Sequence, residues 1–222
     1  HENDNKYAIF EIQYIAEAGQ GNPMVTLTVH SNPGTDWCGN NLMTGTHVYI
    51  ERGLQRHFIA KDEITGEYID KRADGTLNLK ETVDEDGNIV TSEGKTFYTK
   101  YFESKVKRAK FGMSDMDATI VDRSYWPQNF QLLRIEDIML LYAECMGNTI
   151  EGRELVNKIR RRAGLADLDI NLSEEEFQKA VQDERRYELA EEGVRWFDLV
   201  RRNEYVDTLK QMFINDDDTE NG

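Results

Sequence analysis

Several features that define common protein classes are scarce or missing in this sequence of 222 residues. It has two cysteines, too few for a disulfide framework, and three prolines, few for a chain rich in linkers. No apolar run approaches the length of a transmembrane helix, and the opening HENDNKYAIF does not have the pattern of a signal peptide. We therefore expect neither a disulfide-stapled scaffold nor a membrane-spanning protein, while the redox compartment stays open.

Basic residues are also fewer than acidic residues. The sequence has 42 acidic residues against 27 lysines and arginines, which gives a net charge of −15. This charge argues against a nucleic-acid backbone or an anionic membrane surface as partner, because both would repel the protein. Hydrophobic residues make up 39% of the chain, with ten tyrosines and nine phenylalanines. The chain can therefore bury a core, as one domain or two small ones.

The usual signatures of metal, cofactor and catalytic sites are missing as well. His30, His47 and His57 lack metal-ligand spacing, so we expect them to be solvated or packed. The stretch DEDGNIVTSE begins like a calcium loop, but an EF-hand needs Gly and Glu where the sequence has Ile89 and Lys95. A hairpin turn explains this stretch better, and adventitious Ca²⁺ binding by it stays open. With no Gly-rich phosphate loop or nucleophile elbow, we predict no cofactor, no metal and no catalytic residue.

Residues 1–130 have the composition of a loop-rich region with short strands, since they hold 11 of the 16 glycines and all three prolines. KYAIFEIQY and MVTLTVH alternate like β-strands. TLNLKETVDEDGNIVTSEGKTFYTKYF predicts two strands joined by a turn at Asp86-Gly87-Asn88, with another turn at Glu93-Gly94. YIERGLQRHF fits a short helix. The long loop SNPGTDWCGNNLMTGTH lies between them, and loops of this length usually carry function or mobility.

Residues 131–222 change to a hydrophobic period of 3.6, which predicts a helical bundle. The first helix begins near Arg134, and EGRELVNKIRRRAG predicts a second helix closed by Gly164. One face of the first helix carries Ile135, Ile138, Met139, Tyr142 and Met146. The fold class is therefore mostly α, with a minor β element and long loops.

A third helix begins at a clear capping box. Ser173 and Glu176 stand three residues apart, and Leu172 and Phe177 are placed as a hydrophobic staple. We expect this helix to run to about Gly193, after which VRWFDLVRR starts or continues a helix.

The stretch ERRYELAEEGVRWFDLVRR, residues 184–202, combines five arginines with five carboxylates. By helical phase Glu184 and Glu188 lie on the apolar face of the third helix, and Arg195 and Asp198 join them if the helix is continuous. Charges on an inward face must be paired, and arginine is a permanently charged, bidentate partner. A catalytic carboxylate would instead stay acidic or nucleophilic beside an open cleft. We therefore interpret the stretch as scaffold, with all four side chains buried and mutually paired.

Three blocks of this region resemble the SusD/RagB family. RIEDIMLLYAEC resembles its Arg-x-x-Glu-x-x-Leu-x-Tyr-Ala-Glu-Ala helix, and LVNKIRRRAGL is similar to its Leu-x-Asn-x-x-Arg-x-Arg-Ala-Gly segment. ERRYELAEEGVRWFDLVRR is similar to its Glu-Arg-Arg-x-Glu-Leu-x-x-Glu-Gly-x-Arg-x-Phe-Asp-Leu-x-Arg signature. YAIFEIQY, YWPQNFQLLR and the Asp-x-Arg element in YIDKR resemble the family more loosely, so the likeness covers nearly the whole chain. The resemblance implies a scaffold role for these residues: Arg134, Asp137, Glu144, Asn157, Arg160, Arg162, Glu184, Arg185, Glu188, Gly193, Arg195 and Asp198.

Some features depart from the family pattern. Asp137 stands where the family usually has Glu, and Cys145 where it usually has Ala; both suit packing between helices. Family members are longer and begin with a lipoprotein signal, so the resemblance implies that this chain corresponds to a C-terminal portion. It also implies a non-catalytic outer-membrane lipoprotein that faces the cell exterior. Such a protein captures oligosaccharides and passes them to a SusC-like TonB-dependent transporter, while a minority of the family captures peptides.

An oligosaccharide site uses aromatic faces against the sugar ring, flanked by amide and carboxylate partners for the hydroxyls. Trp37 is the leading candidate platform, in the loops of residues 31–60, and the alternative is a packed loop anchor. Its polar neighbours are Asp36, Asn40 and Asn41.

Two adjacent aromatic residues precede a proline just before the first helix. Tyr125 and Trp126 are second candidates, for which packing against the bundle is the alternative. Trp196 is assigned to the core.

Two functions from other classes stay open beside glycan capture. One is a glycoside hydrolase built on paired carboxylates, which would turn over an oligosaccharide. The other is a helical adaptor that binds protein, which would need a large exposed apolar groove. The sequence does not name the glycan, because loop side chains determine it and vary freely on one scaffold.

Overall fold

The computed structural model describes these parts of the chain: residues 7–15, 20–22, 51–78, 81–83, 89–91, 97–98, 100 and 128–217. Contacts divide the chain into two units. Unit 1 comprises His1–Asn5, Phe10–Ile50 and Ala73–Leu132, and unit 2 comprises Lys6–Ile9, Glu51–Arg72 and Leu133–Gly222. A division at residue 130 stays a prediction, and the structure adds that Glu51–Arg72 groups with the C-terminal helices.

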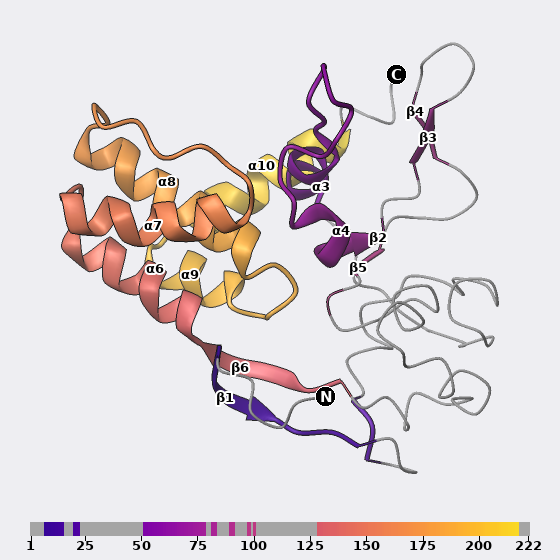
Figure 1. Cartoon of the computed structure of the whole chain (residues 1–222), viewed down its shortest axis with the longest axis horizontal. Coiled ribbons are helices and arrows are strands. Elements are labelled where there is room, and N and C mark those ends of the chain that lie inside the picture. The colour runs from indigo at the N-terminus through magenta and orange to yellow at the C-terminus, as the bar shows by residue number, and fades with distance from the viewer. Residues whose placement is uncertain are drawn as a thin grey trace. The chain divides into compact units, whose positions relative to one another are not determined.

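Helices make up most of the described part of unit 2. They are α3 (Arg52–Ile59), α6 (Ile135–Met146), α7 (Ile150–Arg162), α8 (Glu174–Glu188), α9 (Arg195–Arg201) and α10 (Tyr205–Asp217). The helices α6, α7 and α8 pack against one another as a layered group (Figure 1). The mostly α fold class and the C-terminal helical bundle are therefore confirmed.

The core of unit 2 lies where α6, α7 and α8 meet. Each of these helices contributes two buried apolar side chains, spaced three or four residues apart, which is the spacing of one helical face. The six are Leu140, Ala143, Val156, Ile159, Phe177 and Val181. Burying a side chain of leucine size stabilises a fold by about 1.5–3 kcal/mol. This core therefore fixes the three helices that carry many of the charged side chains around it.

The local signals at helix ends are confirmed. Ser173 Oγ accepts a hydrogen bond from the Glu176 amide at 3.2 Å, and Glu176 Oε2 accepts one from the Ser173 amide at 2.7 Å. Leu172 packs against the core cluster that contains Phe177, as a hydrophobic staple requires. Gly164 follows α7 with a φ of +78°, the left-handed conformation that glycine adopts most easily.

The third helix ends earlier than its sequence predicts. The helix α8 stops at Glu188, and a tight turn follows before α9 begins at Arg195. In this turn Glu191 has a φ of 69° and Gly193 a φ of 77°, so both lie in the left-handed region. A continuous helix through this turn is therefore wrong, and the helical phase of α8 does not extend to α9.

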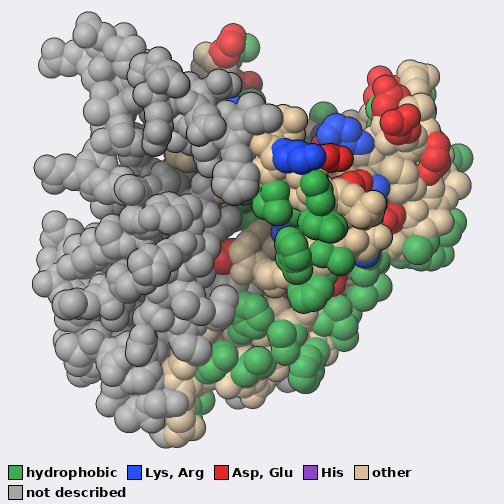
Figure 2. Space-filling view, turned by 180° about the vertical axis from the view of Figure 1, so that it is seen from behind, with side chains coloured by type: hydrophobic (Ala, Val, Ile, Leu, Met, Phe, Trp, Pro, Cys, Tyr) green, Lys and Arg blue, Asp and Glu red, His purple; other side chains and the backbone are tan. Residues whose placement is uncertain are grey.

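The predicted apolar face of α6 is only partly turned to the core. Ile135, Ile138 and Tyr142 are exposed, whereas Leu140 and Ala143 are fully buried. The helix is apolar on both sides, so periodicity shows that it has apolar faces but not which of them packs on α7 and α8. Figure 2 shows hydrophobic side chains gathered on the face of the described part that it displays.

Two further placements are wrong. The side chain of Trp196 was assigned to the core, but the residue is 53% exposed, with its ring edge against Tyr205 at a centroid distance of 5.9 Å. It lies on α9, whose separate start turns Leu199 and Asp198 inward instead. Cys145, expected to pack between helices, is also exposed.

The small β element is confirmed, and the described residues form three short strand pairs. They are β1 (Ala8–Ile12) with β6 (Phe130–Arg134), β2 (Leu77–Asn78) with β5 (Phe97–Tyr98), and β3 (Glu81–Val83) with β4 (Ile89–Thr91). The pairs β2–β5 and β3–β4 are antiparallel. The pair β3–β4 is the hairpin predicted around Asp86-Gly87-Asn88, and a short helix α4 (Ala73–Thr76) precedes β2. The predicted strand MVTLTVH lies outside the described residues.

Candidate functional site

Nine charged residues of unit 2 converge around the C-terminal half of α8. We call them the buried charge cluster, whose edge is formed by the exposed Arg162: Asp70, Arg72, Arg134, Glu136, Arg160, Arg162, Glu184, Glu188 and Glu192. They come from the end of the Glu51–Arg72 segment, the start of α6, the last turn of α7, and α8 with the turn that follows it. Five carboxylates meet four arginines, so most of the charge is compensated within the cluster.

Arg134 connects the start of α6 to the end of α8. Its Nη1 donates to Glu188 Oε1 at 2.6 Å, and its Nε and Nη2 donate to the two oxygens of Glu192 at 2.7 and 2.8 Å. Burial opposes the charge of Arg134, but Glu192 and Glu188 outweigh it, so the pKa of the guanidinium is raised. A paired bidentate contact of this kind fixes the geometry of both side chains.

Arg72 joins the Glu51–Arg72 segment to α8. Its Nη1 donates to Glu184 at 2.7 Å and to Glu188 at 3.0 Å, while Nη2 donates to Asp70 at 2.7 Å. Burial alone would raise the pKa of Asp70, but the hydrogen bonds from His57 and Arg72 hold it well below its usual range. The loose Asp-x-Arg resemblance in YIDKR thus falls on two residues that pair with each other and with α8.

A second group of ion pairs holds α6 beside α9. Arg185 donates to Asp198 Oδ2 at 2.9 Å, and its Nη1 lies 2.8 Å from Asp137 Oδ1. Arg201 meets Glu144 through two hydrogen bonds of 2.8 and 2.7 Å. The buried Arg185 thus lies between the carboxylates of Asp137 and Asp198, and Arg201 lies 2.9 Å from Asp198 as a second positive partner.

The predicted burial is confirmed for three of the four residues, but the predicted pairing of the four with one another is wrong. Glu184, Glu188 and Asp198 are buried and paired with arginines. Arg195 is half-buried and forms no ion pair with any residue that the structure describes. Burial and the nearby positive charge of Arg186 lower the pKa of Arg195. Glu184 and Glu188 are paired by arginines of other elements, because the turn after α8 rotates Arg195 away from the helix face that carries them.

The remaining signature residues have structural roles. Asn157 is buried in α7, and its Oδ1 accepts a hydrogen bond from the Leu168 amide at 2.9 Å. Arg160 donates to Glu184 at 3.3 Å, and Arg162 donates to Glu188 at 2.6 Å. Gly193 has the left-handed φ that ends the turn between α8 and α9.

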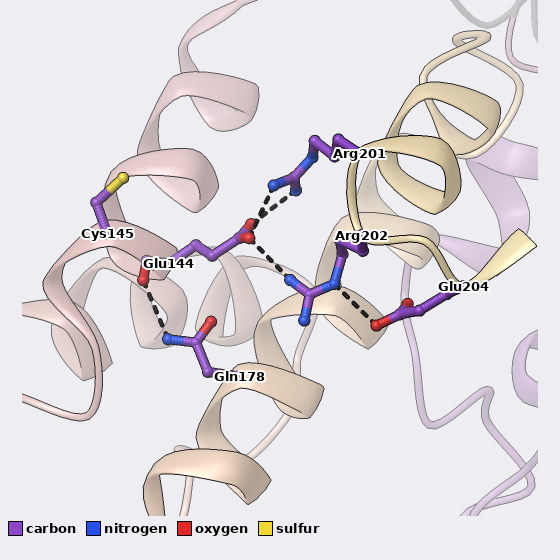
Figure 3. A pocket seen from close by; sticks show the side chains of 6 residues that line it. All are labelled: Glu144, Cys145, Gln178, Arg201, Arg202 and Glu204. Atoms are coloured by element: carbon purple, nitrogen blue, oxygen red, sulfur yellow. Dashed lines mark hydrogen bonds and ion pairs between the residues drawn. The ribbon is translucent and has the colours of Figure 1, made fainter.

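A surface pocket of about 520 Å³ lies beside the second group of ion pairs (Figure 3). Its lining residues are Glu144, Cys145, Gln178, Arg201, Arg202 and Glu204. Glu144 accepts from Arg201 and from Arg202 Nη1 at 2.8 Å, and these guanidinium groups lower its pKa. The pocket offers no aromatic face, and its charged groups are turned toward one another (Figure 3). It therefore lacks the stacking surface that a sugar ring requires.

The sequence predicts a scaffold role for Glu144 but does not indicate this pocket. Arg201 and Arg202 stand at the end of the arginine-rich stretch, and Gln178 belongs to α8. Their meeting with Glu144 joins positions more than 30 residues apart, so no local spacing could have indicated it.

The candidate glycan-binding residues lie outside the part of the chain that the structure describes. They are Asp36, Trp37, Asn40, Asn41, Tyr125 and Trp126. Of the predicted loops of residues 31–60, the described portion begins at residue 51 and consists mostly of α3, a helix rather than a loop. The aromatic platform for a sugar therefore stays a prediction.

The described ranges contain neither a candidate metal site nor a helix that could cross a membrane. In these ranges no group of three or more His, Cys, Asp or Glu side chains could hold a metal ion. His57 instead lies 2.8 Å from Asp70 and stacks on Tyr187, as expected for a packed histidine. His30, His47 and most of the DEDGNIVTSE stretch fall outside these ranges. No described helix is both long and apolar enough to cross a membrane.

Comparisons with known proteins identify a matching family and partial relatives of this chain. The model of the SusD family matches residues 8–222. Among curated proteins, SusD-like protein P38 of Formosa agariphila is 37% identical over 92 residues, which cover 36% of this chain and 18% of that protein.

Solved structures share the fold. Surface glycan-binding protein A from Bacteroides uniformis superposes with a TM-score of 0.57 at 26% identity, covering 89% of this chain and 38% of that one. Surface glycan-binding protein A from Bacteroides thetaiotaomicron, in complex with laminarihexaose, gives a TM-score of 0.59 at 19% identity, covering 89% of this chain and 43% of that one. The chain thus spans less than half the length of each of these relatives.

Proposed function

The chain belongs to the SusD family, and from this membership we propose that the protein captures oligosaccharides at the cell surface without cleaving them. The observation that carries the proposal is the family match over residues 8–222, together with the ion pairs made by every charged signature residue except Arg195. The solved relatives named as surface glycan-binding proteins, one of them holding laminarihexaose, indicate the class of ligand.

The proposal extends to the setting of the protein. It acts as an outward-facing lipoprotein of the outer membrane and hands its ligand to a SusC-like TonB-dependent transporter. A peptide-capturing member of the family is the alternative, since the scaffold is compatible with both ligands.

The described carboxylates support binding rather than hydrolysis. A glycoside hydrolase needs one carboxylic acid whose pKa is raised, so that it stays protonated beside the scissile bond. In the described part of the chain every carboxyl group with a shifted pKa has it lowered, as at Asp70, Glu136 and Glu144. His57 and Arg72 cause the lowering at Asp70, and arginine partners cause most of it at Glu136 and Glu144, because they stabilise the charged form and outweigh the opposing effect of burial.

We place the sugar platform at Trp37, with Asp36, Asn40 and Asn41 as hydroxyl partners. The reason is chemical: a tryptophan among short polar side chains offers both the stacking face and the hydrogen bonds that a sugar needs. Tyr125 and Trp126 are the next candidates.

The experiment uses the whole gene product and isothermal titration with laminarihexaose, followed by the best glycan from an array. Trp37→Ala should cost on the order of 2 kcal/mol of affinity, as for a buried aromatic hot spot. Trp196→Ala is the matched control, because it removes the same side chain from an exposed position on α9 that is not a candidate for the site. Equal affinities of the wild type and Trp37→Ala would remove Trp37 from the site and move the search to Tyr125 and Trp126.

A further inference from the structure

The helix α6 is apolar on two sides, and only one of them packs in the core of unit 2. Leu140 and Ala143 are fully buried against α7 and α8. A second apolar stripe is formed by Ile135, Ile138 and Tyr142, which follow one another at intervals of three and four residues. These three residues are between 42 and 47% exposed. A helix that is hydrophobic around most of its circumference is typical of a central position, with other elements packed on both of its sides.

The neighbouring helix α9 also has an apolar side that the core does not use. The second group of ion pairs holds α9 beside α6, as Figure 1 also shows. The helix turns Leu199 inward, whereas Phe197 and Val200 are 70 and 46% exposed. Trp196 is left out of this group, because its ring edge already meets Tyr205 of α10.

The exposed apolar side chains of the two helices are too few for a firm complex between separate molecules. We call them the outer apolar residues: Ile135, Ile138, Tyr142, Phe197 and Val200. Together they expose on the order of 500 Å² of apolar surface, a size at which the patches of monomeric proteins are often functional. A stable complex of separate chains buries about 800 Å² on each partner. A segment tethered in the same polypeptide needs less surface, because the tether keeps its local concentration high.

The solved relatives indicate where a tethered segment comes from. This chain spans less than half the length of the two surface glycan-binding proteins described above, although each of them matches 89% of it. These relatives therefore have further chain beyond the part that they share with this one.

We propose that the outer apolar residues bind a further segment of the same polypeptide, outside these 222 residues, through an apolar face of that segment. The helix α6 then lies in the centre of the whole gene product, with α7 and α8 on one side and the further segment on the other. This inference is independent of glycan capture, because it concerns the assembly of the polypeptide and not its ligand.

Hydroxyl-radical footprinting of the whole gene product tests whether the outer apolar residues are covered. The sample is kept monomeric, as checked by light scattering. Ile170, in the loop between α7 and α8, is the matched control for Ile138, because it is the same residue type in the same unit. The exposed fractions of 42% for Ile138 and 75% for Ile170 predict that an uncovered Ile138 is oxidised a little more than half as fast as Ile170. A covering segment should slow the oxidation of Ile138 to less than about a tenth of the rate of Ile170, because the centre of such an interface is packed like a protein interior.

Photocrosslinking of the same monomer identifies the segment. Tyr142 and Phe197 are replaced one at a time by a photoreactive phenylalanine analogue, and Ile170 is replaced as the control. Both outer positions should form links to residues outside the 222, and the control position should not.

A substitution gives an independent readout. Ile138→Asp places a carboxylate in the proposed interface, where an unpaired charge is costly, whereas Ile170→Asp places it in solvent. In the whole gene product Ile138→Asp should lower the midpoint of thermal unfolding by at least about 5 °C more than Ile170→Asp.

Several results would overturn the inference. They are oxidation of Ile138 at more than half the rate of Ile170, equal thermal shifts in the two aspartate variants, and the absence of links from the outer positions. Links between two copies, or links only to residues 1–222, would also overturn it, because they assign the outer apolar residues to a different occupant. None of these measurements uses a ligand, so a failure of the proposed function leaves their outcome unchanged.

Discussion

Replacing Arg134 should damage the fold far more than replacing Arg195, although both belong to the signature blocks. Arg134 is buried and holds Glu188 and both oxygens of Glu192, so Arg134→Met leaves a buried carboxylate without its bidentate partner. Breaking a buried pair from one side destabilises a protein by about 3–5 kcal/mol. Glu188 keeps Arg72 and Arg162 in the variant, which puts the expected loss near the lower end, about 3 kcal/mol.

Arg195→Met is the matched substitution at a half-buried arginine that pairs with no described residue. It should change the free energy of unfolding by less than about 1 kcal/mol, as for most positions outside a buried network. Urea denaturation followed by circular dichroism gives both values, provided that the slope with denaturant stays the same. Equal losses in the two variants, or an unchanged stability in Arg134→Met, would refute the assignment of the buried charge cluster as scaffold.

Two further stability measurements test individual features. The pKa of Asp70 is lower in the folded chain than its ordinary value of 3.8, so its charge stabilises the fold above that pH and the contribution is lost as pH falls through the folded pKa. The stability gap between the wild type and Asp70→Asn should therefore be full at pH 7 and shrink at pH 3, and a constant gap would contradict this. Ser173→Ala removes half of the capping box and should destabilise the fold by about 1 kcal/mol, whereas Ser173→Asp should keep most of it. An alanine variant as stable as the wild type would show that the cap contributes nothing.

The parts of the fold that the sequence predicts are those with local causes. The capping box at Ser173 needs only two residues three positions apart, and the β3–β4 hairpin needs only a turn between two short strands. Gly164 ends α7 because glycine tolerates the left-handed conformation. Each of these features is decided within one or two turns of chain, so a pattern in the sequence is sufficient.

The parts that the sequence did not predict have nonlocal causes. A continuous helix would place Arg195 on the same face as Glu184. The left-handed turn at Glu191 interrupts the helix, so the two residues do not share a face. Glu184 instead pairs with Arg72, 112 positions away, and with Arg160, 24 positions away. The orientation of α6 was missed for a related reason, because a helix that is apolar on both sides does not reveal which side packs.

The most direct test of the account measures binding and turnover on the same sample. The whole gene product is titrated calorimetrically with laminarihexaose and with array-selected oligosaccharides, and the recovered sugar is then analysed by mass spectrometry. The account predicts saturable binding of at least one oligosaccharide that is recovered intact after long incubation, with affinity weakened in Trp37→Ala. Shortened oligosaccharides in the recovered sample, or binding of peptides with no binding of any glycan, would contradict it.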